Sequence, residues 1–292
     1  MEQSSGNQAR WEGSTLTIAH EASADENGWP LAGPHDPSAF ADRLYADESF
    51  DPTIESLPPD EGAEPYSLQW FLNIENQRHG RQGRWIPRLM EFSKHAGEQL
   101  LGLGNGLGTD WLQYARNGAF MTVCSPSAEQ LALIRRNFEL RGLGGRFLHA
   151  DPAHLPLESA SIDVACISSL LHEVADPVPV IYEVYRVLKP GGKVLAVTPA
   201  KYDVDFWTRI VFPWKRQRQQ PLPHARFSAR RLKRLFGCFV EHRVHKRQLR
   251  RKELPRLWRI LPTSVLERLI GRVLVLKAFK PLSSAMQDSL AA

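Results

Sequence analysis

Apolar positions along residues 99–198 follow two alternating patterns, short continuous runs and segments with helical spacing. The continuous runs are 100–103, 119–124, 147–148, 162–167 and 193–198. Continuous apolar runs are typical of strands buried on both faces, and helical spacing is typical of the helices that cover them. Because the two patterns alternate, the sequence predicts parallel strands joined by helices in a doubly wound α/β sheet.

Helix boundaries within this region carry their own signals. Ser127 and Gln130 form a capping box, in which the serine side chain binds the amide of residue 130 and the glutamine reaches back. Asp176 and Pro177 predict the start of another helix, and the run 189–192, Lys-Pro-Gly-Gly, predicts its end. Each predicted helix thus lies between two predicted strands.

The flanking regions complete the predicted sheet. Aromatic residues between Tyr66 and Phe92 predict two helices before the first strand, placed to cover the sheet edge. After an insertion at 199–227, Ser228 caps a basic helix with apolar residues on one side. Two further strands are predicted at 238–245 and 272–279, giving a mostly parallel sheet of seven strands.

Glycines gather where the first strand ends. Gly104, Gly106 and Gly108 follow the run 100–103 and precede a predicted helix. Glycine permits sharp turns and lets a ligand lie close to the backbone. The spacing is G-x-G-x-G and not the dinucleotide pattern G-x-G-x-x-G, whose third glycine falls on Leu107 or Thr109. The turn is either a ligand cradle or a plain strand-to-helix turn with incidental glycines.

Charged residues are unevenly distributed along the 292 residues, with an acidic N-terminal segment and a basic C-terminal half, although the net charge is only +5. Residues 1–66 hold fourteen acidic and two basic residues, whereas residues 201–280 hold twenty-two basic and five acidic ones. We expect 1–65 to be a disordered acidic arm, 66–282 to be the folded domain and 283–292 to be a tail. The basic half suits phosphate groups, a membrane surface or the arm itself.

Other classes of function are not indicated. The three cysteines are far apart and predict reduced, buried thiols in an intracellular protein. The polar start and the lack of a membrane-spanning apolar run predict a cytoplasmic location. His149, Asp151 and His154 are too dispersed to predict a metal site. Nucleic acid is not an expected partner. The apolar residues of the basic half follow helical and strand periodicities, which predicts that they are buried in the core and not exposed for stacking on bases. The basic amphipathic run 256–262 either covers the sheet or suits a membrane interface, peripheral to the membrane.

Four motifs in fixed order carry a family resemblance over residues 70–281. They are the glycine turn, A-D-P-A-H-L-P-L at 150–157, L-L-H-E-V at 170–174 and L-K-P-G-G at 188–192. Together they resemble class I S-adenosylmethionine-dependent methyltransferases of the methyltransferase-11 type, including quinone-biosynthesis enzymes. The resemblance implies a Rossmann-like fold, S-adenosyl-L-methionine as cofactor, and a lid over the cofactor formed by the helices before the first strand. A lid over the cofactor is the alternative to the role proposed above for these helices, which is to cover the edge of the sheet.

The resemblance also implies site residues. The cofactor-binding set comprises Gly104, Asn105, Gly106, Gly108, Ser125, Asp151, Pro152, Ile167 and Ser168. Asp151 and Pro152 are expected beside the adenine, and Ile167 and Ser168 below the cofactor. His172 is the candidate catalytic general base, with a structural histidine as the alternative.

Two positions depart from the family pattern. Gly102 and Ser125 stand where the family carries acids, and a hydroxyl at Ser125 offers the ribose a weaker hydrogen bond than a carboxylate. The loss is roughly 1–3 kcal/mol of binding free energy. We therefore expect a methyltransferase acting on a small-molecule or lipid-like acceptor. The alternative is a non-catalytic methyltransferase-like protein that acts through its charged surfaces.

Overall fold

The structure is a computed structural model that carries side chains. It describes residues 63–104, 106–211, 225–249, 254–255, 258 and 260–282. The predicted acidic arm before residue 63 and the predicted tail from residue 283 lie outside the described residues. The same holds for Asn105 and for the basic run 215–218.

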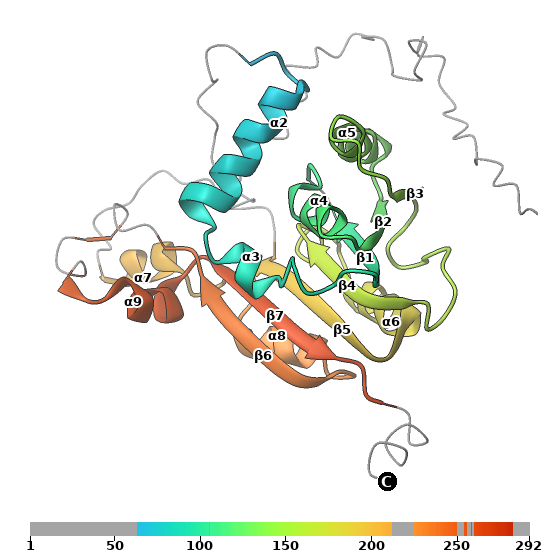
Figure 1. Ribbon diagram of the computed structural model, residues 1–292. Coiled ribbons are helices and arrows are strands. Elements are labelled where there is room, and N and C mark those ends of the chain that lie inside the picture. The colour runs from blue at the N-terminus through green and yellow to red at the C-terminus, as the bar shows by residue number, and fades with distance from the viewer. Residues whose placement is uncertain are drawn as a thin grey trace, which may run out of the picture. The chain divides into compact units, whose positions relative to one another are not determined.

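Seven strands form one sheet in the order β3-β2-β1-β4-β5-β7-β6 (Figure 1). Their bounds are β1 Gln99–Gly104, β2 Phe120–Ser125, β3 Arg146–His149, β4 Ile162–Ser168, β5 Leu188–Pro199, β6 Val240–Arg247 and β7 Val273–Phe279. Only β7 runs antiparallel to its neighbours β5 and β6. The predicted doubly wound, mostly parallel sheet of seven strands is confirmed.

One predicted boundary is wrong. The run 189–192 was expected to end a helix and precede the fifth strand, but β5 already begins at Leu188. Leu188 pairs with Ile162 of β4, and after an irregularity the pairing resumes between Lys193 and Val164. The turn residues are thus accommodated within the strand, because pairing on both sides of them holds the backbone in the sheet.

The strand order reverses between β1 and β4, which lie side by side in the middle of the sheet. The chain proceeds outward from β1 through β2 to β3, and then restarts on the other side with β4. Open α/β sheets bind ligands at the carboxyl ends of the strands beside such a reversal. This position is occupied by the glycine turn after β1 and by the loop after β4.

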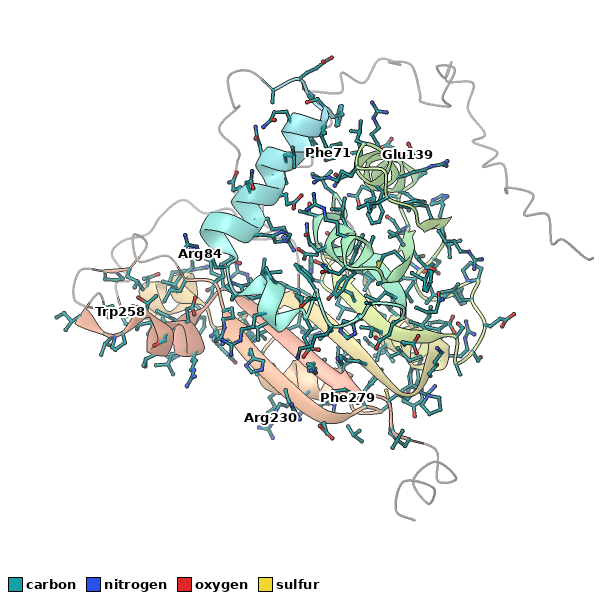
Figure 2. The ribbon with its side chains drawn as sticks, in the orientation of Figure 1. Phe71, Arg84, Glu139, Arg230, Trp258 and Phe279 are labelled. Atoms are coloured by element: carbon teal, nitrogen blue, oxygen red, sulfur yellow. The ribbon has the colours of Figure 1, made fainter. Side chains whose placement is uncertain are left out.

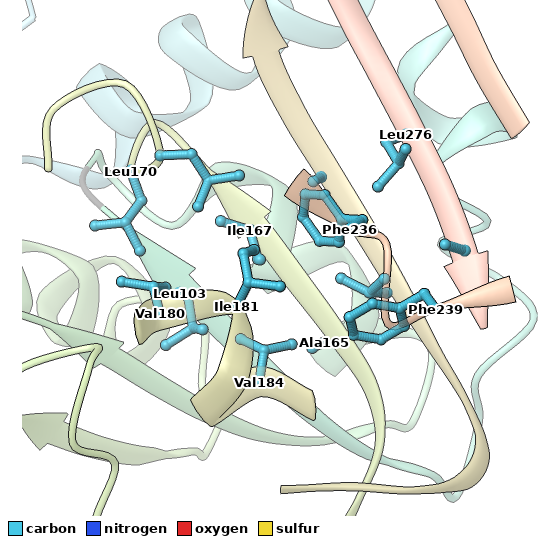
Figure 3. Close-up of a cluster of buried hydrophobic side chains, with 14 of the residues drawn as sticks. Leu103, Ala165, Ile167, Leu170, Val180, Ile181, Val184, Phe236, Phe239 and Leu276 are labelled. Atoms are coloured by element: carbon cyan, nitrogen blue, oxygen red, sulfur yellow. The ribbon is translucent and has the colours of Figure 1, made fainter. Parts of the chain in front are cut away.

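Helices cover both faces of the sheet. Their bounds are α2 Leu68–Glu75, η1 Asn76–Gln82, α3 Ile86–Leu89, α4 Thr109–Arg116, α5 Ala128–Glu139, α6 Val178–Val187, α7 Val204–Val211, α8 Ala229–Leu235 and α9 Thr263–Ile270. The π-helix η1 directly continues α2. Figure 3 shows one face, where apolar residues of α6, such as Val184, and Phe236 after α8 pack on strands β4 and β7. The opposite face is covered by α3, α4 and α5.

The predicted helix caps on two helices are confirmed. Ser127 accepts a hydrogen bond from the Gln130 amide (3.3 Å) at the start of α5. Ser228 accepts one from the Arg231 amide (3.1 Å) at the start of α8. Within the described residues, no helix has the length and apolar character required to cross a bilayer.

Candidate functional site

The glycine turn joins β1 to α4 beside the end of β4. Gly104 has a positive φ of 136°, and an added Cβ would lie 1.8 Å from the Ser168 carbonyl oxygen. The backbone of Gly104 is therefore packed directly against β4. Gly106 also has a positive φ, 126°, but an added Cβ would meet no atom within 4 Å. Gly106 thus turns an open backbone surface toward space that a ligand can fill.

A pocket opens at this turn. Its lining comes from three parts of the chain, and comprises Ile74, Arg78, Gly106, Leu107, Gly108, Thr109, Asp110, Trp111, Ser168 and Ser169. Ile74 and Arg78 belong to α2 and η1, whereas Ser168 and Ser169 end β4. The pocket therefore lies at the topological reversal of the sheet, with the first helix opposite the glycine turn.

The strongest electrostatic feature of the pocket is a buried ion pair. The Arg78 guanidinium donates through Nε to Asp110 Oδ1 (2.7 Å) and through Nη2 to Oδ2. His79 Nε2 lies 2.8 Å from Asp110 Oδ1. Burial alone would raise the pKa of the Asp110 carboxyl, but the charge and hydrogen bonds of Arg78, with His79, hold it well below its usual value. The pocket thus has one cationic and one anionic wall group, both ionised.

The helix that carries Arg78 is held by a second set of polar contacts. Glu75 accepts hydrogen bonds from Gln113 (2.8 Å) and Arg116 (2.7 Å) of α4. Its other carboxylate oxygen lies 2.6 Å from Arg141 after α5. Ile74 of α2 and Arg78 of η1 line the pocket, which is the position that the lid interpretation requires, so α2 and η1 are the candidate lid. The cover describes α3, whose Ile86 packs into the core of the sheet.

Ser125 ends β2, as predicted, but its side chain has no exposed area. Its hydroxyl accepts a hydrogen bond from the Ser127 amide at 3.2 Å. The predicted reverse half of the capping box is wrong, because Gln130 does not bind back to Ser127. Gln130 Oε1 instead accepts a hydrogen bond from the Gly106 amide at 3.3 Å. The first turn of α5 is therefore tied to the glycine turn.

Asp151 lies in the loop after β3 and is exposed. Its carboxylate accepts a hydrogen bond from the Ala153 amide (2.9 Å) and lies 2.9 Å from His154 Nδ1. The hydrogen bond from the Ala153 amide, and to a smaller extent the contact with His154, lower the pKa of Asp151. Pro152 beside it is buried. Neither residue lines the pocket at the glycine turn.

The remaining predicted residues separate into two groups. Gly106, Gly108 and Ser168 line the pocket together. Ile167 does not line the pocket and is buried in an apolar cluster of the sheet (Figure 3). The His172 side chain is 1% exposed, and its Nε2 lies 3.4 Å from Glu173 Oε1. No group of three metal-ligating side chains occurs among the described residues.

Sequence reasoning missed Arg78, Asp110 and Ser169. Asp110 carried a usable signal, because a carboxylate in the first turn of a helix that follows a glycine turn is typical of a site. Ser169 is identified by its positive φ of 51°, which only the structure reveals. Arg78 carried no local signal, since its role depends on a partner 32 residues away.

Comparisons with known proteins show which proteins this chain resembles. Residues 100–196 match the family model of the methyltransferase-11 type, described as a methyltransferase domain. This is the family type that the ordered motifs resemble, and the match covers about a third of the chain. The matched residues run from β1 into β5 and contain the glycine turn and the end of β4.

The curated relatives that match the chain are named as methyltransferases. The chain is 36% identical over 157 residues to a demethylmenaquinone methyltransferase of Clavibacter sepedonicus, covering 52% of this chain and 60% of the relative. It is 32% identical to a demethylmenaquinone methyltransferase of Thermus thermophilus, covering 40% and 55%. A malonyl-[acyl-carrier protein] O-methyltransferase of Serratia marcescens is 33% identical, with 40% and 46% covered. The chain thus spans less than two thirds of the length of these relatives.

Solved structures show the same fold. A putative methyltransferase from Bacillus halodurans aligns with a TM-score of 0.51 at 18% identity, over 68% of this chain and all of that one. A putative methyltransferase from Haloferax volcanii, solved with its Trm112 activator, aligns with a TM-score of 0.51 at 17% identity, over 75% and 99%. At these identities the likeness shows the fold alone.

Proposed function

We propose that the protein is an S-adenosylmethionine-dependent methyltransferase acting on a small-molecule or lipid-like acceptor. The observation that carries the proposal is Gly106, which faces open space in a pocket at the reversal of the sheet. The family match over residues 100–196 supports it, and so do the relatives named for methylation of demethylmenaquinone. The non-catalytic alternative is not favoured by these comparisons.

The residues of the pocket fit the cofactor. A Cβ at Gly106 would occupy the open space, so a glycine leaves that space to a ligand. The pocket offers backbone amides, serine hydroxyls and the paired charges of Arg78 and Asp110, with no phosphate-binding lysine among its lining residues. This donor set suits the zwitterionic methionine part of S-adenosylmethionine, which carries a carboxylate and an amine and no phosphate. The cofactor supplies an electrophilic methyl group on a sulfonium.

Each part of the chain has a role within this proposal. Gly104 to Gly108 and Arg78 are proposed to hold the methionine part, with Ser168 and Ser169 supporting it from the end of β4. Ser125, buried at the end of β2, is the position assigned to the ribose side. Asp151 and Pro152 lie on the adenine side. Methyl transfer depends mainly on in-line positioning of donor and acceptor. His172 is the candidate general base if the acceptor must lose a proton.

We further propose that the basic C-terminal half contacts a membrane peripherally, because lipid-like acceptors reside there. Each Lys or Arg near an anionic surface contributes about 1 kcal/mol of attraction, and salt weakens it. Co-sedimentation with vesicles should therefore rise with anionic lipid and fall with salt. In the proposed organisation, residues 66–282 form the methyltransferase domain, with the insertion 199–227 after β5.

Calorimetric titration with S-adenosylmethionine and with S-adenosylhomocysteine tests the cofactor proposal. We expect saturable binding of both by the full chain. Gly106→Val should abolish binding while circular dichroism shows a folded protein, because the side chain fills the open space. Gly142→Val is the matched control, since Gly142 also has a positive φ and open surroundings but lies outside the pocket. Equal binding by the Gly106 variant and the parent would place the cofactor elsewhere.

A further inference from the structure

The helices α7 and α9 form a small unit outside the pocket. The two helices lie side by side at one end of the sheet (Figure 1). Val204 of α7 and Leu266 and Ile270 of α9 are buried in one apolar cluster. Arg272, which follows α9, donates to both carboxylate oxygens of Asp205 in α7 at 2.6 and 3.0 Å. The two helices are therefore fixed to each other by an apolar core and an ion pair.

The outward side of α7 is also apolar. Trp207, Ile210 and Val211 follow one another at helical spacing and are all exposed, Ile210 to 56%. Residues three and four apart in a helix share a face. This 8-residue helix therefore buries one apolar face in the cluster and presents a second one to its surroundings.

The outward side of α9 repeats the pattern. Leu261, Val265 and Leu269 follow one another at intervals of four residues and are exposed, Leu269 to 61%. Ile260, just before the helix, is 82% exposed. Both helices thus present exposed apolar side chains in addition to their buried ones, and clustered exposed apolar residues mark interaction surfaces. Figure 2 shows Trp258 at this end of the molecule, beside α7 and α9.

Positive charge surrounds these apolar faces. Lys201, Arg209 and Arg268 are exposed, whereas nearby Asp203 is buried and paired with Arg226 (2.5 Å). In the sequence, α7 leads into 212–224 and α9 is preceded by 250–259. These two stretches contain eight Lys and Arg and a single acid. Exposed basic side chains thus accompany the apolar faces, and the sequence adjoining both helices is basic.

We propose that the outward faces of α7 and α9 form a surface that docks on the anionic headgroups of a lipid bilayer, with their apolar side chains inserted at the interface. This inference deepens the peripheral contact proposed above, which involves charge alone. An apolar stripe flanked by Lys and Arg is typical of interfacial helices, and tryptophan is enriched at that depth. A second copy of the chain fits less well, because its Arg209 and Arg268 would meet like charges.

Flotation of the full chain with phosphatidylcholine vesicles, with and without phosphatidylglycerol, tests the inference. Ile210→Gln and Leu269→Gln should each lower the partition coefficient about tenfold, since each removes an inserted apolar side chain. Arg268→Gln should lower it about fivefold on anionic vesicles only. Phe120→Gln is the matched control, because Phe120 is 60% exposed on β2, outside this surface. It should leave partitioning unchanged, and all variants should keep the parent's melting temperature.

Three results would overturn the inference. If the parent binds anionic vesicles and the two glutamine variants bind equally well, contact is by charge alone, and the peripheral contact stands without insertion. If the parent binds no vesicles, both proposals fail. If the parent forms a lipid-independent dimer that Ile210→Gln and Leu269→Gln dissociate, the surface binds a second copy instead. None of these results bears on methyl transfer, which is measured separately.

Discussion

At the scale of single residues, the two departures from the family pattern have different physical causes. A Cβ on Gly102 would lie 2.8–3.0 Å from atoms of the Trp111 ring, so the indole fills the space that a side chain would need. Ser125 instead ends β2 beside the first turn of α5, and its hydroxyl accepts the Ser127 amide. Packing against Trp111 thus excludes an acid at position 102, whereas position 125 already lies beside a hydrogen-bond donor, the Ser127 amide.

Restoring an acid at the first position should damage the fold. Gly102→Asp forces the side chain into the Trp111 ring and buries a carboxylate there, so we expect a loss of about 3 kcal/mol or more in unfolding free energy. Urea denaturation measures the loss. Trp111→Leu opens the space, so Gly102→Ala should cost less in that background than in the parent. Additive effects of the two changes would contradict a direct clash.

Restoring an acid at the second position should strengthen the cofactor site. Ser125→Asp places a carboxylate at the start of α5, where helix amides favour negative charge. We expect S-adenosylhomocysteine to bind more tightly by roughly 1–3 kcal/mol, the difference between charged and neutral hydrogen bonds. Titration calorimetry and thermal denaturation on the same variant are both needed. A destabilised variant with no gain in affinity would mean that the position is closed by packing, and it would count against the enzyme.

At the scale of elements, the sequence predicted the positions of the strands better than the role of the helices before β1. Buried strands are marked by their own apolar runs, so β1, β2 and β4 were located to within one residue. The extended β5 was not predicted, because residues 189–192 carry turn signals, and only the pairing of Leu188 and Lys193 with β4 on either side of them keeps this stretch in the sheet. The sequence also did not decide between a lid and an edge cover for the helices before β1, because it carries no local signal of their contacts. Arg78 and Asp110, which fix η1 to α4, lie far apart in the sequence.

The ion pair between η1 and α4 should determine how firmly the lid is held. Asp110→Asn keeps the shape but leaves the Arg78 guanidinium buried without its counter-charge, so we expect a loss of about 3–5 kcal/mol in unfolding free energy. Hydrogen exchange of the α2 amides should accelerate, because the lid opens locally. Arg135→Gln is the control, since the exposed pair of Arg135 with Glu139 contributes within about 0.5 kcal/mol. Unchanged exchange in α2 would show that Glu75 alone holds the lid.

At the scale of the whole molecule, one carboxylate joins segments that are distant in the sequence. Glu91 follows α3 and accepts hydrogen bonds from Lys193 of β5 and Lys277 of β7, each at 2.7 Å. Lys94 adds a third at 3.1 Å. No sequence pattern predicted this cluster, because its members are up to 186 residues apart. It fixes the segment before β1 to strands β5 and β7.

This cluster should make stability depend on acid pH. Burial alone would raise the pKa of Glu91, but the hydrogen bonds and charges of its lysine partners lower it from 4.5 to about 2. A carboxyl with a lowered pKa stabilises the folded state fully above about pH 5, and this contribution is lost as the pH falls toward about 2. Glu91→Gln should therefore reduce unfolding free energy at pH 7 by roughly 1–3 kcal/mol. The difference from the parent should shrink steadily between about pH 5 and about pH 3. Urea denaturation across this range measures it, with the exposed Glu139→Gln as a control that should show little difference at any pH. A deficit that stays constant with pH would mean that Glu91 contributes packing and no charge.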